Sequence, residues 1–198
     1  MYRLYGRKGS GSVAPQMMLE ELGLPHEVVW VSKEAAQQPA YRKIHPQGRV
    51  PALQLPNRQV MLESAAMVIH LCAVKPGVLA PEPGSSAHAQ FLQWMVFLSA
   101  GLYETYLRYF YSDRYGEAAS VKGKAAQELL TLYAVLEDTL SPRLLGEAIT
   151  AADFYLWMLS TWHDSPEQLY RRFPKLGRLA EEVAERPAVA KVVQLNQG

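Results

Sequence analysis

Hydrophobic positions near the start of the chain follow short runs that change in character every few residues. Residues 2–5 are apolar and aromatic, residues 14–22 carry helix formers up to Gly23, and residues 26–31 are rich in β-branched side chains. Short β-branched or aromatic runs favour strands, whereas a longer run of helix formers that stops at glycine favours a helix. The order predicts strand, helix and strand, and therefore a parallel β-α-β opening.

Three further elements are predicted before residue 75. Residues 40–44 favour a single helical turn, residues 59–61 a short strand after a Pro-Asn turn, and residues 63–74 a mostly apolar helix. Together with the opening, they predict a small α/β domain.

The segment 47–55, QGRVPALQL, has the hydrophobic content of a strand but contains Pro51 near its start. Proline lacks a backbone N–H and has a fixed φ, so it does not pair within the centre of a sheet. The segment is therefore either an edge strand or a bend whose backbone has another role.

The stretch 75–86, KPGVLAPEPGSS, separates this region from a helical one. It holds three prolines and two glycines, which do not propagate regular structure. We therefore expect an α/β domain at 1–76, a linker at 77–86 and an all-helical domain at 87–198. Within the last, helical spacing of apolar residues predicts helices at 87–111, 121–140 and 151–162 and further turns from 175.

Composition and charge narrow the class of protein. The 198 residues are 49% hydrophobic, which suffices for substantial cores without metals or disulfides. The net charge of +1 lacks the basic excess of nucleic-acid-binding proteins. The N-terminus has no signal-peptide pattern, and no run approaches the roughly 18 apolar residues of a membrane span. We expect a cytoplasmic protein with no nucleic-acid or membrane partner.

Cysteine and histidine positions argue against metal and disulfide chemistry. Cys72 is the only cysteine and lies in an apolar run, which excludes an intramolecular disulfide, a CxxC redox pair and a thiolate zinc site. His45, His70, His88 and His163 have no metal-ligand spacing, and we interpret them as structural or surface residues. No metal is expected.

Three motifs, in their order along the chain, resemble the cytosolic glutathione transferases of bacterial type. Residues 48–53 read GRVPAL, residues 62–64 read LES, and residues 146–153 fit G-x-x-x-T-x-A-D, in which Thr150 and Asp153 form a capping box. The resemblance covers nearly the whole chain. It implies a thioredoxin-like N-terminal domain, an all-α C-terminal domain, a homodimer and glutathione as co-substrate.

The resemblance also implies how glutathione is held. The Val50-Pro51 bond is cis in this family, so that Val50 offers its N–H and C=O to the cysteinyl backbone of glutathione. Ser64, at the start of a helix, would hold the γ-glutamyl carboxylate, and Glu63 would face the α-ammonium group. From the residues alone, Glu63 and Ser64 are also ordinary helix-start residues.

Three hydroxyl groups are candidates for activating the glutathione thiol. A hydroxyl at a helix N-terminus stabilises a thiolate, so we place Ser12, the expected cap of the first helix, ahead of Ser10 and then Tyr5. The loop SGSVAP resembles the ACSLAP-like pattern of the beta class, with Gly11 in place of its cysteine. This departure excludes a mixed disulfide between the loop and glutathione.

The helical domain begins with an aromatic-rich stretch, most of which we expect in the core. Tyr103 and Tyr106 are the residues we expect to line the electrophile site. The resemblance implies transfer of the glutathione thiolate to a hydrophobic electrophile. Two alternatives remain: a glutathione-dependent isomerase or dehalogenase, and a non-catalytic interaction protein with this fold.

Overall fold

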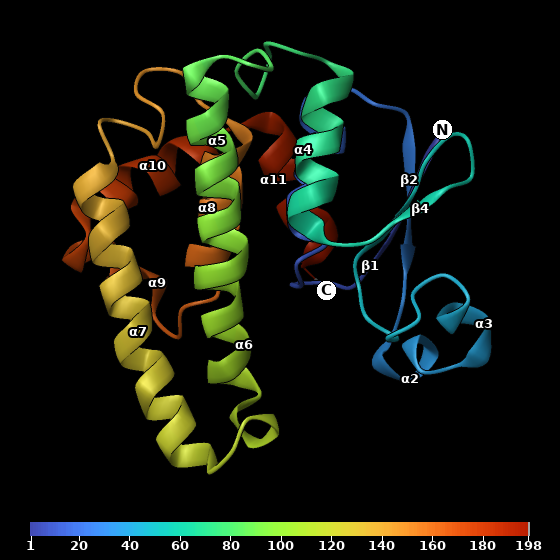
Figure 1. Cartoon of the computed structure of the whole chain (residues 1–198), viewed down its shortest axis with the longest axis horizontal. Coiled ribbons are helices and arrows are strands. Elements are labelled where there is room, and N and C mark those ends of the chain that lie inside the picture. The colour runs from blue at the N-terminus through green and yellow to red at the C-terminus, as the bar shows by residue number, and fades with distance from the viewer. Residues whose placement is uncertain (198) are drawn as a thin grey trace. The chain divides into compact units, whose positions relative to one another are not determined.

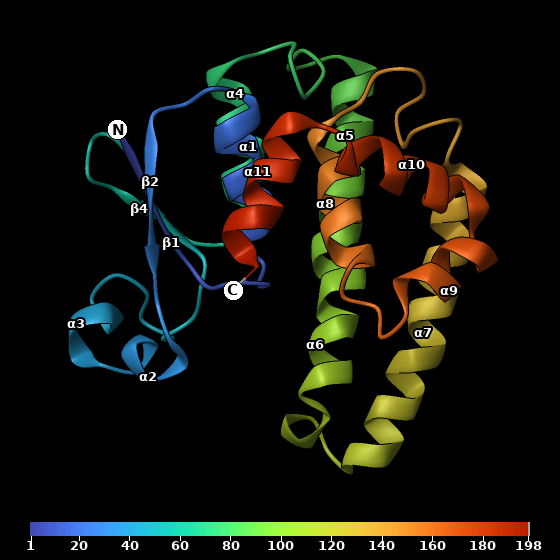
Figure 2. The ribbon, with the colours of Figure 1, turned by 180° about the vertical axis from the view of Figure 1, so that it is seen from behind.

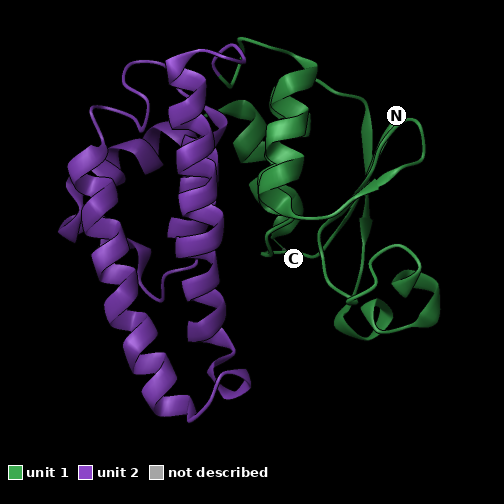
Figure 3. Cartoon of the chain, in the orientation of Figure 1, with its two compact units in different colours: residues 1–80, 184–198 green, residues 81–183 purple. Residues whose placement is uncertain are grey.

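The computed structural model describes residues 1–197, which form two compact units (Figure 3). Unit 1 contains residues 1–80 together with the C-terminal segment from residue 184, and unit 2 contains residues 81–183. The C-terminal segment was predicted as part of the helical domain, whereas its packing groups it with the α/β part of the chain.

Unit 1 is built on a mixed four-stranded sheet in the order β2-β1-β3-β4. The strands are β1 (Tyr2–Gly6), β2 (His26–Trp30), β3 (Ala52–Gln54) and β4 (Val60–Met61). Strands β1 and β2 are parallel, which confirms the predicted β-α-β opening, and β3 pairs antiparallel with both β1 and β4. Only three residues of the segment 47–55 enter the sheet, and all three lie after Pro51.

Helices α1 (Val13–Glu21) and α4 (Ser64–Val74) pack on each other on one face of this sheet, and α11 (Pro187–Asn196) packs against α1 (Figure 2). Their contact is apolar: Met17, Met18, Met67, Val68 and Leu71 are completely buried. Two short helices, α2 (Lys33–Ala36) and α3 (Pro39–Arg42), follow β2. Helix α3 overlaps the turn predicted at 40–44, whereas α2 was not predicted.

Unit 2 is built from helices joined by loops (Figure 1). Its elements are α5 (Ser86–Val96), the π-helix η1 (Phe97–Tyr103), α6 (Glu104–Phe110), the 3₁₀-helix η2 (Ser112–Arg114), α7 (Ala118–Thr139), α8 (Ala151–Ser160), α9 (Pro166–Arg172) and α10 (Pro174–Ala184). All ten residues of α8 are buried, so this helix is the centre of the unit 2 core. Helix α9 was not predicted, and neither was the π-helical segment within the predicted helix 87–111.

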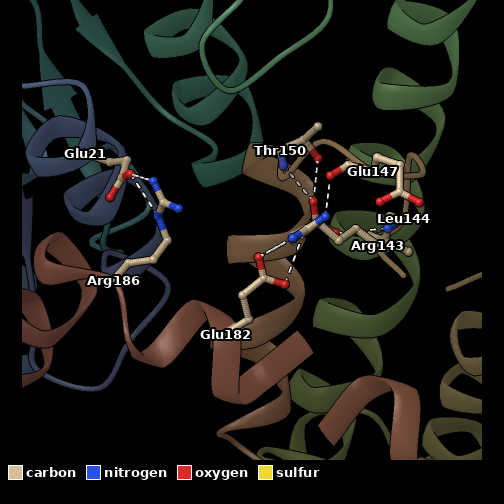
Figure 4. Close-up of polar contacts among 8 residues, drawn as sticks. Glu21, Arg143, Leu144, Glu147, Thr150, Glu182 and Arg186 are labelled. Atoms are coloured by element: carbon tan, nitrogen blue, oxygen red, sulfur yellow. Dashed lines mark hydrogen bonds and ion pairs between the residues drawn. The ribbon is translucent and has the colours of Figure 1, made fainter. Parts of the chain in front are cut away.

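The predicted capping box at the start of α8 is confirmed. The Asp153 carboxylate accepts hydrogen bonds from the Thr150 N–H at 2.7 Å, the Thr150 hydroxyl at 2.9 Å and the Leu144 N–H at 3.0 Å; Thr150 and Leu144 are labelled in Figure 4. Burial raises the pKa of the Asp153 carboxyl group, while these hydrogen bonds oppose that shift. Nearby, Arg143 pairs with Glu182 and donates to the Glu147 carbonyl, which ties the preceding loop to α10.

Candidate functional site

The sheet topology brings the predicted glutathione-binding segments to one end of unit 1. Strand β1 leads into the loop 7–12, which carries Ser10 and Ser12. Because β3 runs antiparallel to β1 and to β4, the start of β3 lies at the same end as the finish of β1 and of β4. Val50 and Pro51 precede β3, and Glu63 follows β4, so all three segments meet there.

Val50, at this end of the sheet, has main-chain groups that are open, meaning that they make no hydrogen bond within the described chain. The Val50-Pro51 bond is cis, as the family resemblance implied. Within residues 1–197, neither the N–H nor the C=O of Val50 takes part in a hydrogen bond. The Val50 side chain packs on the buried cluster of Val31, Ala36 and Tyr41. The side chain therefore anchors the residue while its two main-chain groups remain available for an extended peptide.

Contacts from α2 and α3 fix the turn that leads into Val50. The Gln37 side chain donates to the Gly48 carbonyl at 3.1 Å, and the Tyr41 hydroxyl donates to the Arg49 carbonyl at 2.8 Å. Gly48 has φ +63, and a Cβ there would lie 2.6 Å from the Ala36 carbonyl oxygen. Only glycine fits this combination of a left-handed backbone and a close approach. The supporting roles of Gln37 and Tyr41 have no signal in the sequence and follow from these contacts with the turn.

Glu63 and Ser64 lie at the N-terminus of α4, as predicted. Glu63 has φ +69, which is uncommon for a residue other than glycine, and its side chain is exposed. Such a conformation costs about 1–3 kcal/mol and tends to occur at functional sites. No side chain caps α4, and the first N–H groups of any helix point away from its own carbonyl groups. Ser64, 8% exposed, is the first residue of the helix.

The Ser10 and Ser12 hydroxyls lie close to each other, at 3.0 Å, but differ in exposure. Ser12 is completely buried, whereas Ser10 is partly exposed. Ser12 Oγ accepts from the Arg7 N–H at 3.1 Å and donates to the Arg7 carbonyl at 3.0 Å. Ser12 occupies the N-cap position of α1, as expected, but its hydroxyl makes no capping hydrogen bond and bonds to Arg7 instead. Ser10 also donates to the Arg7 carbonyl, at 2.7 Å.

Tyr5 lies in β1 and is partly exposed. Its ring packs edge-on against Tyr41, with 6.0 Å between the ring centroids, and it adjoins the same buried cluster as Val50. In the sheet it pairs with Ala52, two residues after Val50. Tyr5 is therefore placed on the same side of the unit as the open main chain of Val50.

The two predicted electrophile-site tyrosines occupy different environments in unit 2. Tyr106 is 1% exposed, and its hydroxyl is 2.9 Å from that of the buried Tyr133, so it is a core residue of this unit. Tyr103 is partly exposed and packs edge-on against Trp162, with centroids 5.0 Å apart. Of the pair, Tyr103 has the more accessible side chain.

Among residues 1–197, no group of three or more histidine, cysteine or acidic side chains could hold a metal ion, and no helix is long and apolar enough to cross a membrane. Cys72 is buried, and burial raises the pKa of its thiol to about 12. His45 is buried as well, and burial together with the charge of Arg49 lowers its pKa.

Two family models match the chain. The model of the glutathione S-transferase N-terminal domain matches residues 13–74, and the model of the glutathione S-transferase C-terminal domain matches residues 101–194. The predicted fold class, a thioredoxin-like α/β domain followed by an all-α domain, is confirmed.

Individual relatives cover the chain almost completely. An uncharacterized GST-like protein of Escherichia coli, YncG, is 28% identical over 100% of this chain and 99% of its own length. A glutathione transferase homologue from Sulfitobacter, solved with bound glutathione, has a TM-score of 0.89 at 26% identity and covers 100% of this chain and 99% of its own. A sphingomonad glutathione S-transferase complexed with glutathione has a TM-score of 0.87 at 27% identity, with 98% of each chain covered.

Proposed function

Because the chain belongs to the glutathione S-transferase family, we propose that it binds glutathione through unit 1 and transfers the glutathione thiolate to a hydrophobic electrophile. The observation that carries this proposal is the open main chain of Val50 beside the cis Val50-Pro51 bond. The similar Sulfitobacter and sphingomonad proteins, both solved with glutathione, support the identity of the ligand.

Glutathione is an extended tripeptide, and its cysteinyl and γ-glutamyl residues have matching groups at this end of the sheet. The N–H and C=O of Val50 pair with the cysteinyl main chain, as one strand pairs with another. The γ-glutamyl carboxylate binds at the N-terminus of α4, where Ser64 and the positive end of the helix dipole favour an anion. The exposed Glu63 carboxylate takes the α-ammonium group.

Ser10 is the hydroxyl best placed to stabilise the thiolate. Ser12 is completely buried, so a ligand cannot touch it while the loop keeps this conformation. Ser10 is partly exposed and can turn its hydroxyl hydrogen from the Arg7 carbonyl to the thiolate. Ser12, which bonds to both main-chain groups of Arg7, then serves to hold the loop. We thus propose the reverse of the order expected from the sequence for these two serines.

The reaction follows from this arrangement. The thiol gives its proton to solvent, and the charge-assisted hydrogen bond from Ser10 favours the thiolate. The thiolate sulfur then forms a bond to the electrophilic carbon, while the electron pair of the bond that breaks leaves with the departing group or moves into the acceptor. Tyr103 contributes to the surface that receives the electrophile. We further propose a homodimeric, cytoplasmic protein that uses no metal.

A second candidate function is glutathione binding without transfer, as in a non-catalytic interaction protein. It is favoured by the fact that both the Ser10 and the Ser12 hydroxyls donate to the Arg7 carbonyl. In that state neither hydroxyl offers its hydrogen to a thiol. The two functions differ in the pKa of the bound thiol, which is lowered only when a hydroxyl turns to it.

Ser64→Ala is expected to weaken glutathione binding about ten- to hundredfold, because it removes a hydrogen bond to a carboxylate. Isothermal titration of the wild-type and variant proteins measures the change. Ser86→Ala is the matched control, since Ser86, like Ser64, is the first residue of an 11-residue helix. Unlike Ser64, Ser86 is exposed. The control variant should leave the affinity unchanged. Equal affinities of all three proteins would place the carboxylate elsewhere, and no binding by the wild type at millimolar glutathione would reject the proposed function.

Ser10→Ala is expected to raise the pKa of the bound thiol by about one to two units while glutathione still binds. Thiolate absorbance of the bound complex, followed against pH, gives this pKa directly. Ser12→Ala should instead lower the melting temperature, because it leaves the partly buried Arg7 N–H without the Ser12 acceptor.

The comparison of these serine variants has three informative results. A larger pKa shift in Ser12→Ala than in Ser10→Ala would restore the order expected from the sequence. A shift confined to Tyr5→Phe would assign the role to the tyrosine. A thiol pKa that is ordinary in the wild type and unchanged in every variant would favour glutathione binding without transfer.

A further inference from the structure

The side chain of Asn196, at the end of the last helix, makes a hydrogen bond with each of its polar groups. Its Oδ1 accepts from the Gly9 N–H at 3.2 Å. Its Nδ2 donates to the Gln16 side-chain oxygen at 3.0 Å and to the Val192 carbonyl at 2.8 Å. The bond to Val192 fixes the side chain on its own helix, and the other two bonds tie it to the loop 7–12 and to the first turns of α1.

Two ion pairs hold α11 and the residue before it against the same helix. Arg186 pairs with Glu21, as the left part of Figure 4 shows, and Lys191 pairs with Glu20 at 2.8 Å. Both acidic residues lie at the end of α1, whereas Asn196 contacts its beginning. Helix α11 is therefore attached along the length of α1, and its final residue reaches the loop that carries Ser10.

The surroundings of Gln16 are independent evidence that its hydrogen bond with Asn196 has a structural role. This side chain is completely buried, and its Nε2 has no hydrogen-bond partner in the part of the chain that the structure describes. Within that same part, the bond from Asn196 is the polar contact that this buried amide group makes. A buried amide with a single bond depends strongly on that bond for its orientation.

We propose that Asn196 is a positioning residue, which holds the loop 7–12 through the Gly9 N–H and thereby keeps Ser10 where it can reach the glutathione thiol. The inference rests on the proposed function, since it assigns Asn196 a part in thiol activation. Gly9 directly precedes Ser10, so a change at the Gly9 amide moves the Ser10 hydroxyl with it. The C-terminal helix then controls a reaction that begins near the N-terminus.

The chemistry of the contact requires an acceptor on one side and donors on the other. Asparagine supplies both, and alanine supplies neither. Aspartate keeps the acceptor for the Gly9 N–H but loses the donor to the Val192 carbonyl, and the free Nε2 of Gln16 can turn to donate to its second oxygen. Asn196→Asp therefore preserves the hold on the loop, which makes it the conservative partner of Asn196→Ala.

The test measures the loop and the thiol separately in the full chain. In Asn196→Ala we expect the Gly9 amide to exchange with solvent about tenfold faster, because its acceptor is lost. We expect the pKa of the bound glutathione thiol to rise by about one unit. The affinity for glutathione should be nearly unchanged, because the Val50 and Ser64 contacts are intact. Asn196→Asp should restore both values. Lys191→Ala, which removes another contact of α11, should change neither.

The outcomes separate this inference from the proposed function. Unchanged exchange of the Gly9 amide in Asn196→Ala would overturn the inference, whether or not glutathione binds. Faster exchange without any change of the thiol pKa would show that Asn196 holds the loop but does not position Ser10, which also overturns it. Equal effects of Asn196→Ala and Lys191→Ala would reduce Asn196 to general support of α11. A wild-type protein that does not bind glutathione would reject the proposed function itself.

Discussion

Gly48→Ala is expected to destabilise the protein by about 3 kcal/mol and to abolish glutathione binding at millimolar concentrations. The new methyl group would lie 2.6 Å from the Ala36 carbonyl oxygen, which as a main-chain atom cannot move away cheaply. The left-handed φ of +63 adds its own cost for any residue with a Cβ. Relief of the clash would shift the turn that presents Val50, so stability and affinity should fall together. Urea unfolding and isothermal titration measure the two effects.

Gly84→Ala is the control for the backbone cost alone. Gly84 has φ +85, and no atom lies within 4 Å of a Cβ built there. This variant should lose about 1 kcal/mol and bind glutathione like the wild type. If Gly48→Ala and Gly84→Ala were equally stable and bound glutathione equally well, the close approach of Ala36 would not determine the geometry of the turn.

The parts of the site that could be predicted from sequence are those set by local chemistry. Pro51 cannot pair in a central strand, and its conflict with the apolar run around it indicates a bend whose backbone can serve another role. In the fold of unit 2, the Thr150 and Asp153 capping box could also be predicted. Its partners are three residues apart, and its bonds depend only on helix geometry.

The orientation of Ser12 shows why local reasoning fails in the loop 7–12. Its position just before the helix predicts a cap, yet the structure turns its hydroxyl to Arg7. The reason is tertiary: Gly6 has no side chain, and a Cβ there would lie 2.7 Å from Ser12 Oγ. Ser12 therefore fills space left by a strand residue six positions earlier. No cap propensity contains that information.

The packing of α11 against α1 could not be predicted from the sequence either, because it also depends on tertiary contacts. Helical periodicity identifies the buried face of a helix, but not which element covers that face. The contact of Asn196 with Gly9 spans 187 residues of sequence. The ion pairs of Arg186 and Lys191 with the end of α1 span 165 and 171 residues. Only the folded chain shows that the last helix adjoins the loop of the proposed thiol site.

Asp153→Ala is expected to lower the free energy of unfolding by about 3 kcal/mol. The change removes the acceptor of the Leu144 and Thr150 N–H groups at a site where all the atoms are buried. Loss of the cap accounts for about 1 kcal/mol, and the unsatisfied N–H groups add about 1–3 kcal/mol each, partly offset because a buried carboxylate is no longer desolvated. Because α8 is the centre of unit 2, the melting temperature should fall by roughly 6–12 °C.

Two variants show whether this loss comes from the hydrogen bonds. Asp138→Ala removes an exposed carboxylate on α7 and should change stability by no more than about 0.5 kcal/mol. Asp153→Asn keeps the shape and one acceptor oxygen but turns an NH₂ group toward donors, so its stability should lie between those of the wild type and Asp153→Ala. If Asp153→Ala and Asp138→Ala had the same melting temperature, the buried carboxylate would not be required for stability. If Asp153→Asn melted with Asp153→Ala, both carboxylate oxygens would be required, because the amide supplies only one acceptor to the three donors around it.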